Sequence, residues 1–592
     1  MVEMAGHRFR FTRWHWICVG CFAAICTGLA QAAPKARFFN PSPGYQGAKD
    51  LTSDFHGRVD SIAIVVKDAF DGAEVHSDIE ARTFEILNTL HIESKDWVVY
   101  RRLPFALGDT VSAEILREAE KNLRDEEFFA DAYVEVSPMG DTGWAVKVTT
   151  FDQWTLAASP NFKYVGNELV WWFGVVESNL LGFGQRLGFF VSHDLERDTR
   201  WLDYANTFFT PWQLSLAASY AWTSDGYTYN TSLSRPLRSR EDKWGFTLSS
   251  DGSLLSQNLY LSGNDLDKLD GSAEAPADLK KRYESSNIIG YWDDVGTHAA
   301  YASVTRSFGN KLKISVSPYY SRFEQYLSGS FHARNFALRQ SLGIDGTPSL
   351  YRRHNELLGL SGSLYQYDYK TVRNFRNLKW SENIETGWRL TASAAKNQEW
   401  MGADQDDWFF SQTGVLNNAW LDRLFLNSSA SASYYLRNGE KWVDGTVSGN
   451  VETQFKEVWW TSSLFSAGYA HLFATADSRN YTLGEENGLN GYPNFFYTGK
   501  ARLLFAAEQR FFPAFEILTI VPALAVYFNA GNTYDSYRRV DLGDMHYAVG
   551  VGLRAGFSRS VQKVVNHVNL SFPLGEDNIS GFVFSVKASK GL

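Results

Sequence analysis

Residues 212–222 read WQLSLAASYAW and alternate between two kinds of side chain. Successive side chains of an extended strand point to opposite faces, so the large apolar residues of this stretch share one face and the small or polar residues share the other. A strand of about 10 residues with an apolar outer face and aromatic ends fits a bilayer-spanning barrel. The stretch therefore predicts a transmembrane β-barrel.

The same alternation returns near the C-terminus, in residues 500–510, 547–554 and 582–588. In each stretch the charged residues fall on one face, and in the first of them this face includes Glu508 and Arg510. A soluble β-sandwich also alternates, but its polar residues face water and its apolar residues face a second sheet. Charged residues on the inner face favour the barrel. We predict an all-β barrel of about 16 antiparallel strands in residues 153–592, with 251–284 and 328–353 as long surface loops or loop hairpins.

The composition of the chain agrees with a folded, aromatic-rich β protein. The 592 residues are 44% hydrophobic, 21% charged and 15% aromatic, which excludes disorder and a small disulfide scaffold. The formal net charge of −9 gives no reason to expect nucleic-acid binding, because a phosphate-binding protein concentrates Lys and Arg on one face. Beyond the N-terminal segment no run of about 18 apolar residues occurs, so helical membrane spans are not expected.

The N-terminal residues 1–32 are predicted to be a secretory signal peptide. A basic start precedes the largely apolar stretch 14–29, and Ala30-Gln31-Ala32 is a small-x-small cleavage site. A single-pass anchor is the alternative, although the apolar stretch is short for a membrane span. All three cysteines lie in this segment, so the exported chain would contain neither a disulfide nor a thiolate metal site.

Residues 33–57 are predicted to be a linker and residues 58–152 a small α+β domain. The β-branched run 59–66 predicts a strand. Residues 77–90 place Ile79, Phe84, Leu87 and Leu90 at helical spacing, and Ser112 is a suitable N-cap for a second helix. Two alternating strands, 132–137 and 144–150, follow. The expected order is β-α-α-β-β.

This order, followed by a barrel, resembles the BamA/TamA-type outer-membrane-protein assembly superfamily, whose members carry polypeptide-transport-associated (POTRA) domains. Three groups of residues carry the resemblance. The landmarks of one POTRA-like domain are Gly108, Asp109, Phe128, Phe129 and Asp131. A turn similar to the first barrel hairpin of the family contains Asn179, Gly182, Gly184 and Gln185. A loop similar to the family's inward-folded loop contains Leu489, Asn490, Gly491 and Tyr492, and the next strand carries Glu508 and Arg510.

The chain departs from the family at the lumen loop. Family members usually have an Arg at the position of Asn490 and a lumenal Asp on the strand that here contains Asn529 and Gly531. Losing both charges together is electrostatically consistent, and an amide pair between Asn490 and Asn529 would hold the loop more weakly than a charged pair. The alternative is that both asparagines are ordinary loop and lumen residues.

The resemblance implies a protein without enzymatic activity that helps polypeptide or lipid-linked clients enter or cross the outer membrane of a Gram-negative bacterium. Its expected partners are outer-membrane lipids and unfolded clients or periplasmic proteins, which the periplasmic POTRA-like domain would capture by adding a strand to its sheet edge. A weakly paired seam is expected between a first strand near 171–176 and a last strand near 581–588.

Two other functions remain open. A passive channel or structural barrel would keep its lumen clear, and a lipid-modifying enzyme would place a hydroxyl beside a histidine. The sequence has no Gly-x-Ser-x-Gly motif, and its twelve histidines show no His-x-x-x-His spacing. No catalytic, cofactor-binding or metal-binding residue is therefore predicted.

Overall fold

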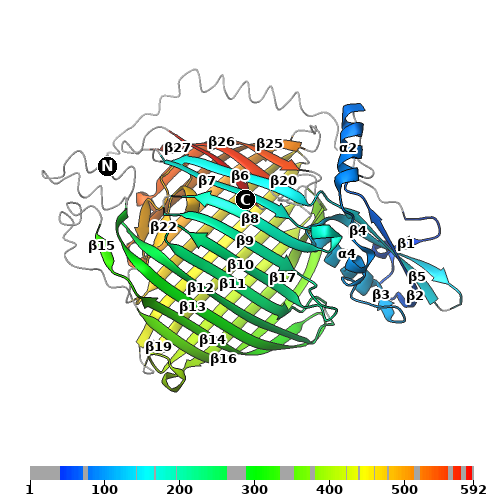
Figure 1. The fold of residues 1–592 in the computed structure, drawn as a ribbon, viewed down its shortest axis with the longest axis horizontal. Helices are drawn as coiled ribbons and strands as arrows, with labels where there is room; N and C mark the ends of the chain where they lie inside the picture. The colour runs from blue at the N-terminus through cyan, green and yellow to red at the C-terminus, as the bar shows by residue number, and fades with distance from the viewer. Residues whose placement is uncertain are drawn as a thin grey trace, which may run out of the picture.

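The computed structural model contains a large β-barrel and a small N-terminal α+β domain packed against one end of it (Figure 1). The described residues are 41–70, 78–141, 143–165, 168–194, 196–239, 241–262, 288–333, 352–373, 381–421, 423–437, 441–458, 460–475, 479–512, 520–557, 565–574 and 582–589. The predicted signal peptide lies outside them.

The N-terminal domain is a five-stranded sheet with three helices. Its strands are β1 (Gln46–Gly47), β2 (His56–Lys67), β3 (Thr110–Ser112), β4 (Phe129–Met139) and β5 (Gly143–Asp152), in the spatial order β1-β4-β5-β2-β3. Its helices are α2 (Asp78–Leu90), α3 (Asp96–Tyr100) and α4 (Ala113–Asp125). The Ser112 hydroxyl accepts a hydrogen bond from the Ile115 amide and caps α4, whose apolar face at Leu116, Ala119 and Leu123 is fully buried.

The sequence-based order β-α-α-β-β misses two short strands of this sheet. Strand β1 lies within residues 33–57, the predicted linker, and pairs with β4 at Glu135 and Val136. Strand β3 pairs with β2 at residues 56–58. Both are too short to show an alternating pattern.

The barrel is closed and antiparallel, and contains twenty described strands in sequence order around the ring. They are β6 (Leu156–Val165), β7 (Glu168–Glu177), β8 (Gln185–His193), β9 (Asp198–Asn206), β10 (Ser215–Thr223), β11 (Gly226–Arg235), β12 (Trp244–Tyr260), β13 (Ile288–Phe308), β14 (Lys313–Leu327), β16 (Arg353–Arg373), β17 (Ser381–Asn397), β18 (Asp407–Trp420), β19 (Leu424–Arg437), β20 (Lys441–Val458), β21 (Thr461–Phe473), β24 (Ala501–Phe511), β25 (Ile520–Tyr534), β26 (His546–Phe557), β27 (Val565–Leu574) and β28 (Val583–Ser589). A short strand, β15 (Phe331–Ala333), adds to β13.

The prediction of a closed β-barrel after an α+β domain is confirmed, but the predicted count of about 16 strands is wrong. Part of the predicted loop 251–284 belongs to β12, which runs to Tyr260, and the predicted loop 328–353 contains β15. Strands β13 and β16 have 21 residues each, more than a bilayer span needs. Residues 251–253 of β12 are Asp-Gly-Ser, which are typical of a turn, so a loop was expected where the strand in fact continues.

The two faces of the wall differ as a lipid-facing barrel requires. On β10 the outward residues Tyr220 and Trp222 are 38% and 50% exposed. On β24 Phe505 points outward, whereas Glu508 and Arg510 are buried inside. The left-handed φ of 60° at Gln213 ends the extended backbone, so β10 begins at Ser215 rather than at residue 212. Among the described residues, no helix has the length and apolar character to cross a membrane.

Candidate functional site: the lumen loop and the barrel seam

The segment between β21 and β24 folds into the barrel. It forms a hairpin of β22 (Tyr481–Leu483) and β23 (Tyr497–Gly499), joined through a one-turn 3-10 helix, η4 (Glu485–Asn487) (Figure 1). The hairpin buries Leu483, Leu489 and Tyr492 completely, against residues from different parts of the ring that include Leu261 and Ala548. The chain's own loop therefore occupies part of the lumen.

The predicted loop residues lie against strands β25 and β26. The Asn490 Nδ2 donates a hydrogen bond of 3.1 Å to Asn529 Oδ1 on β25. The Tyr492 hydroxyl donates to the Tyr547 carbonyl at 3.0 Å. Gly491 has a φ of 93°, and a Cβ there would lie 3.2 Å from the Pro573 nitrogen, so this turn favours glycine.

Gly531 permits the loop to approach the wall. A Cβ at this position would lie 3.0 Å from Leu483 Cδ2 and 3.1 Å from the Leu503 carbonyl oxygen. Glycine at this point of β25 thus leaves room for the fully buried Leu483 of the loop.

Glu508 and Arg510 belong to a buried charged cluster on the lumenal wall. Glu508 accepts from Arg510 Nε at 2.6 Å and from Arg554 Nη2 at 2.8 Å. Arg554 Nη1 also donates to Asn569 Oδ1 at 2.7 Å. The cluster links β24, β26 and β27, so these charges stabilise the wall beside the loop.

The barrel closes at a short seam between β28 and β6. Among the described residues, the two strands pair at three positions, where residues 162–164 of β6 face residues 584–586 of β28. The neighbouring β6–β7 ladder has ten pairs. The predicted first strand near 171–176 is therefore wrong, because 171–176 lies in β7 and β6 precedes it.

The lumen loop holds both strands of this seam through two adjacent glutamates. Lys587 of β28 forms an ion pair with Glu485, its Nζ 2.8 Å from Oε1, and donates a hydrogen bond of 2.9 Å to the Glu485 carbonyl. Lys163 of β6 pairs with Glu486. The Lys163 side chain is 5% exposed and that of Glu485 is fully buried. We call Lys163, Lys587, Glu485 and Glu486 the seam bracket.

The seam bracket was not predicted from the sequence. The Glu485-Glu486 pair stands four residues before the predicted loop motif, and the two lysines lie on strands at opposite ends of the barrel sequence. Only closure of the barrel brings them together. The sequence feature that could have indicated the bracket is a lysine on the lumenal face of the first strand, Lys163, and another on that of the last strand, Lys587.

The predicted first hairpin, 179–185, joins β7 to β8, the second and third strands, and binds the N-terminal domain. Asn179 Nδ2 donates to Ser94 Oγ at 2.9 Å, and the Lys95 amide donates to the Gly182 carbonyl at 3.0 Å. The Asn179 side chain also accepts from the Gly184 amide at 2.6 Å. Gln185 is the first residue of β8 and pairs with Asn206. The turn thus fixes the domain to the barrel.

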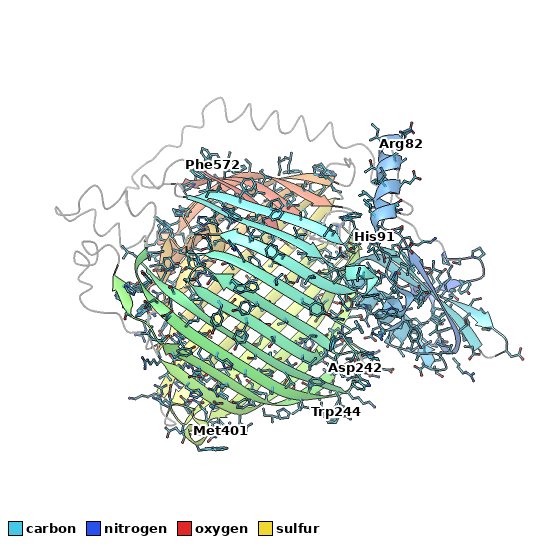
Figure 2. All side chains as sticks on the ribbon, viewed as in Figure 1. Arg82, His91, Asp242, Trp244, Met401 and Phe572 are labelled. Carbon is cyan, nitrogen blue, oxygen red and sulfur yellow. The ribbon has the colours of Figure 1, made fainter. Side chains whose placement is uncertain are left out.

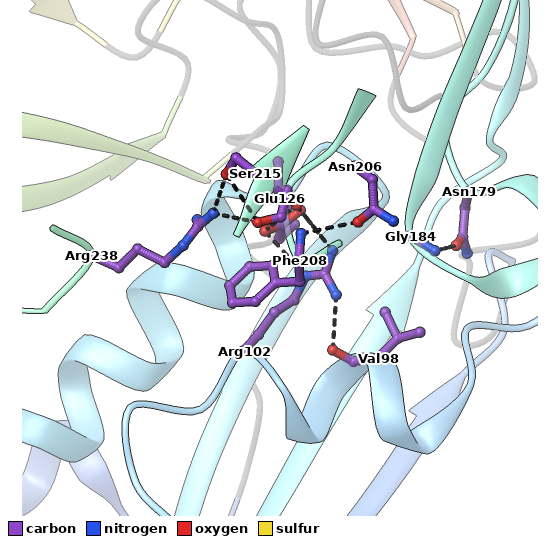
Figure 3. A network of polar contacts seen from close by, with 10 residues as sticks. Val98, Arg102, Glu126, Asn179, Gly184, Asn206, Phe208, Ser215 and Arg238 are labelled. Carbon is purple, nitrogen blue, oxygen red and sulfur yellow. Dashed lines mark hydrogen bonds and ion pairs between the residues drawn. The ribbon is translucent and has the colours of Figure 1, made fainter. Parts of the chain in front are cut away.

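A second contact between domain and barrel centres on Arg102 (Figure 3). Its guanidinium pairs with Glu126 at 3.1 Å and donates to Thr207 Oγ1 of the barrel at 3.2 Å. It also lies 4.5 Å from the ring centroid of Phe208, with Arg238 at 4.1 Å from the same ring. Burial lowers the pKa of Arg238.

The POTRA-like landmarks have structural roles inside the domain. Gly108 adopts a φ of 91°, and the Asp109 carboxylate accepts from the Ala106 amide at 2.8 Å. Phe128 and Phe129 are buried in the core. The Asp131 carboxylate accepts from the Tyr133 hydroxyl at 2.7 Å.

A cavity of about 1050 Å³ opens where the domain meets the barrel. Its lining combines Phe128 and Arg238 with a stack of three lumenal aromatic rings, Trp172, Phe190 and Trp201, whose successive centroids are 5.3 and 4.6 Å apart. The cavity lies next to both domain contacts. Within the described residues, no cluster of His, Cys, Asp and Glu could hold a metal ion.

No protein-family model and no curated protein matches the sequence. Solved structures do match. BamA from Haemophilus ducreyi lacking POTRA domains 1–3 is 11% identical with a TM-score of 0.35, covering 99% of this chain and 95% of that one. CdiB from Acinetobacter baumannii is 10% identical with a TM-score of 0.40, covering 97% of each chain. The alcaligin receptor FauA from Bordetella pertussis is 11% identical with a TM-score of 0.36, covering 77% and 81%.

Proposed function

We propose that this chain is an outer-membrane barrel of a Gram-negative bacterium that assists the insertion or translocation of polypeptide clients, with its N-terminal domain in the periplasm. The observation that carries the proposal is the seam bracket on a three-pair seam. If the barrel only had to be closed, its first and last strands would be expected to pair over more residues. Each further backbone hydrogen bond satisfies an N–H or C=O group that lipid cannot satisfy. A short seam held by side chains can open instead.

The lumen loop supports a gated barrel over a passive channel. An open pore needs a clear lumen, whereas here a buried hairpin contacts β25, β26, β28 and β6 from inside. Releasing Glu485 and Glu486 would free both seam strands in one movement. A client strand could then pair with β6 or β28 and satisfy its backbone groups at the lipid boundary.

The N-terminal domain offers the first contact with an unfolded client. Among the described residues, β1 pairs with two positions of β4, which has 11 residues, and β3 pairs with residues 56–58 of β2. At both edges of the sheet, β4 and β2 therefore extend beyond the residues that β1 and β3 cover. A client strand could form backbone hydrogen bonds along these remaining residues, which gives an affinity that tolerates many client sequences. Capture at such an edge would deliver a client to the cavity at the barrel mouth.

The test is an insertion assay with a lockable seam. Residues 33–592 contain no cysteine, so Phe162→Cys/Val586→Cys places a disulfide on a directly paired seam position. The matched control is Leu216→Cys/Leu233→Cys, a directly paired position of the continuous β10–β11 ladder. The protein comprising residues 33–592 is placed in vesicles with a urea-unfolded eight-stranded barrel as client.

We expect the reduced protein to accelerate client folding, the seam disulfide to abolish the acceleration, and the control disulfide to leave it unchanged. Acceleration that survives the seam disulfide would contradict insertion at the seam. Large, steady ion conductance of the intact protein without any effect on the client would favour the passive channel.

A further inference from the structure

Helix α2 carries a stripe of apolar side chains that the domain does not use. Ile79, Ile86 and Leu90 are 75%, 61% and 66% exposed. Their spacing of seven and then four residues places them on one side of the helix. We call them the α2 stripe.

The helical spacing of Ile79, Phe84, Leu87 and Leu90 did not indicate what covers them. In the structure, only Phe84 of these four is buried, and Leu87 is partly buried. Phe84 stacks on Phe70 with ring centroids 4.9 Å apart, beside Trp154. One half of the apolar face thus packs on the protein, and the half with the stripe remains on the surface.

The helix is fixed next to the seam strand β6. The Phe70 amide donates to Asn88 Oδ1 at 3.0 Å, and His91 Nδ1 lies 2.7 Å from Asp68 Oδ1. Trp154, which packs in the same cluster, stands two residues before the first residue of β6. The position of α2 is therefore coupled to the start of the barrel wall.

Exposed apolar residues continue from α2 to the lipid-facing wall. Ile92 is 47% exposed, and Trp97 is 40% exposed and lies 5.8 Å from the ring of Phe183 in the β7–β8 turn. Leu181 in that turn and Leu187 at the start of β8 are 55% and 42% exposed. Exposed apolar side chains of the domain thus lie beside those of the β7–β8 turn, where Trp97 contacts Phe183.

The orientation of α2 fits a membrane surface. Figure 1 shows α2 beside the end of the barrel nearest the domain. The helix axis lies across the barrel axis, and the free end of the helix extends beyond the barrel wall. In Figure 2, His91 lies at the end of the helix next to the barrel and Arg82 lies toward the free end. A bilayer around the barrel would present its surface along this direction.

We propose that α2 lies on the inner, periplasmic surface of the outer membrane, with the α2 stripe inserted among the lipids beside the seam. An amphipathic helix binds in the interface when its apolar side enters the boundary between headgroups and acyl chains. Trp97, with the Arg101 guanidinium 4.4 Å from its ring centroid, supplies an aromatic and cationic group of the kind found at headgroup level. This lipid contact goes beyond the proposed function and does not depend on a client.

The test measures the depth of single spin labels on residues 33–592, which contain no cysteine of their own. Ile86→Cys labels the stripe, and Glu85→Cys labels an exposed neighbour on the polar side of α2. Both proteins are placed in nanodiscs of phosphatidylethanolamine and phosphatidylglycerol. Collisions of the nitroxide with oxygen, which concentrates in lipid, are compared with collisions with a water-soluble nickel chelate.

We expect oxygen to relax the label at residue 86 at least several-fold more effectively than the nickel chelate, and the reverse at residue 85. Equal access of the chelate to both labels would overturn the proposal. Protection of residue 86 from both reagents with spin coupling between molecules would also overturn it, because a second copy of the chain would then cover the stripe. Leu90→Cys repeats the measurement should labelling at residue 86 disturb the fold.

Discussion

Replacing Lys587 by methionine removes one half of the seam bracket while keeping a side chain of similar length. In the intact protein, Lys587 Nζ lies 2.8 Å from Glu485 Oε1, 2.9 Å from the Glu485 carbonyl and 3.5 Å from Asn490 Oδ1. The Glu485 carboxylate is fully buried and also accepts from the Gly491 amide at 2.8 Å. Without the lysine, a buried negative charge keeps one amide donor and loses its cation.

The expected magnitude follows from that burial. Breaking a buried ion pair by removing one partner costs about 3–5 kcal/mol, because the remaining charge stays uncompensated. Lys587 is 24% exposed, so the lower end of this range applies. Since every 1.4 kcal/mol is a factor of ten, about 3 kcal/mol lowers the ratio of seated to released loop by roughly a hundredfold. Glu485→Gln/Lys587→Met should recover part of the loss, because the uncompensated charge is then also absent.

The assay is single-channel conductance of the full chain in a planar bilayer. We expect rare, brief openings in the intact protein and long openings of large conductance in Lys587→Met, approaching a variant that lacks residues 483–494. Lys441→Met, which removes an exposed lysine at the end of β20, is the matched control and should behave like the intact protein. Equal open fractions in Lys587→Met and in the intact protein would refute the bracket.

Three further outcomes are expected. Burial raises the pKa of Asp152 from 3.8 to about 7, so the folded domain holds this proton where the unfolded chain has released it. The stability of the domain should therefore fall as pH rises from about 4 to about 7 and then level off, and Asp152→Asn should remove this fall in the domain's thermal transition followed by tryptophan fluorescence. Glu508→Gln leaves Arg554 without its carboxylate partner, 2.8 Å away, so the barrel should lose its folded electrophoretic mobility at a lower temperature than the intact protein. Gly182→Ala places a Cβ 2.3 Å from the Glu93 carbonyl oxygen, which should detach the domain from the turn and speed protease cleavage between them; an unchanged cleavage rate would contradict that contact.

The barrel was predictable from sequence where the strand and the bilayer have matching lengths. In residues 500–510 the alternation placed Glu508 and Arg510 inside, and the structure buries both. The alternating stretches 500–510, 547–554 and 582–588 correspond to β24, β26 and β28. The strand count failed in the part of the chain that contains β12, because its residues 251–253 (Asp-Gly-Ser) are typical of a turn although the strand runs to Tyr260.

The lumen loop was predictable only in part. Its residues 489–492 were identified from local sequence, and the structure places Asn490 against Asn529. The seam bracket joins residues far apart in the chain, Lys163 to Glu486 and Lys587 to Glu485, so no local pattern contains it. The exposure of the α2 stripe could not be predicted, because helical spacing identifies an apolar face but does not say what covers it.

The most direct test of a client-inserting seam is photocross-linking during insertion. A photoreactive amino acid at Val586, on the outward side of β28, reports contact with an entering client strand. The same amino acid at Leu216, on the lipid-facing side of the continuous β10–β11 ladder, is the matched control. We predict that a urea-unfolded eight-stranded barrel cross-links to position 586 while it folds and does not cross-link to position 216. Equal cross-linking at both positions, or none at position 586 while folding is accelerated, would contradict insertion at the seam.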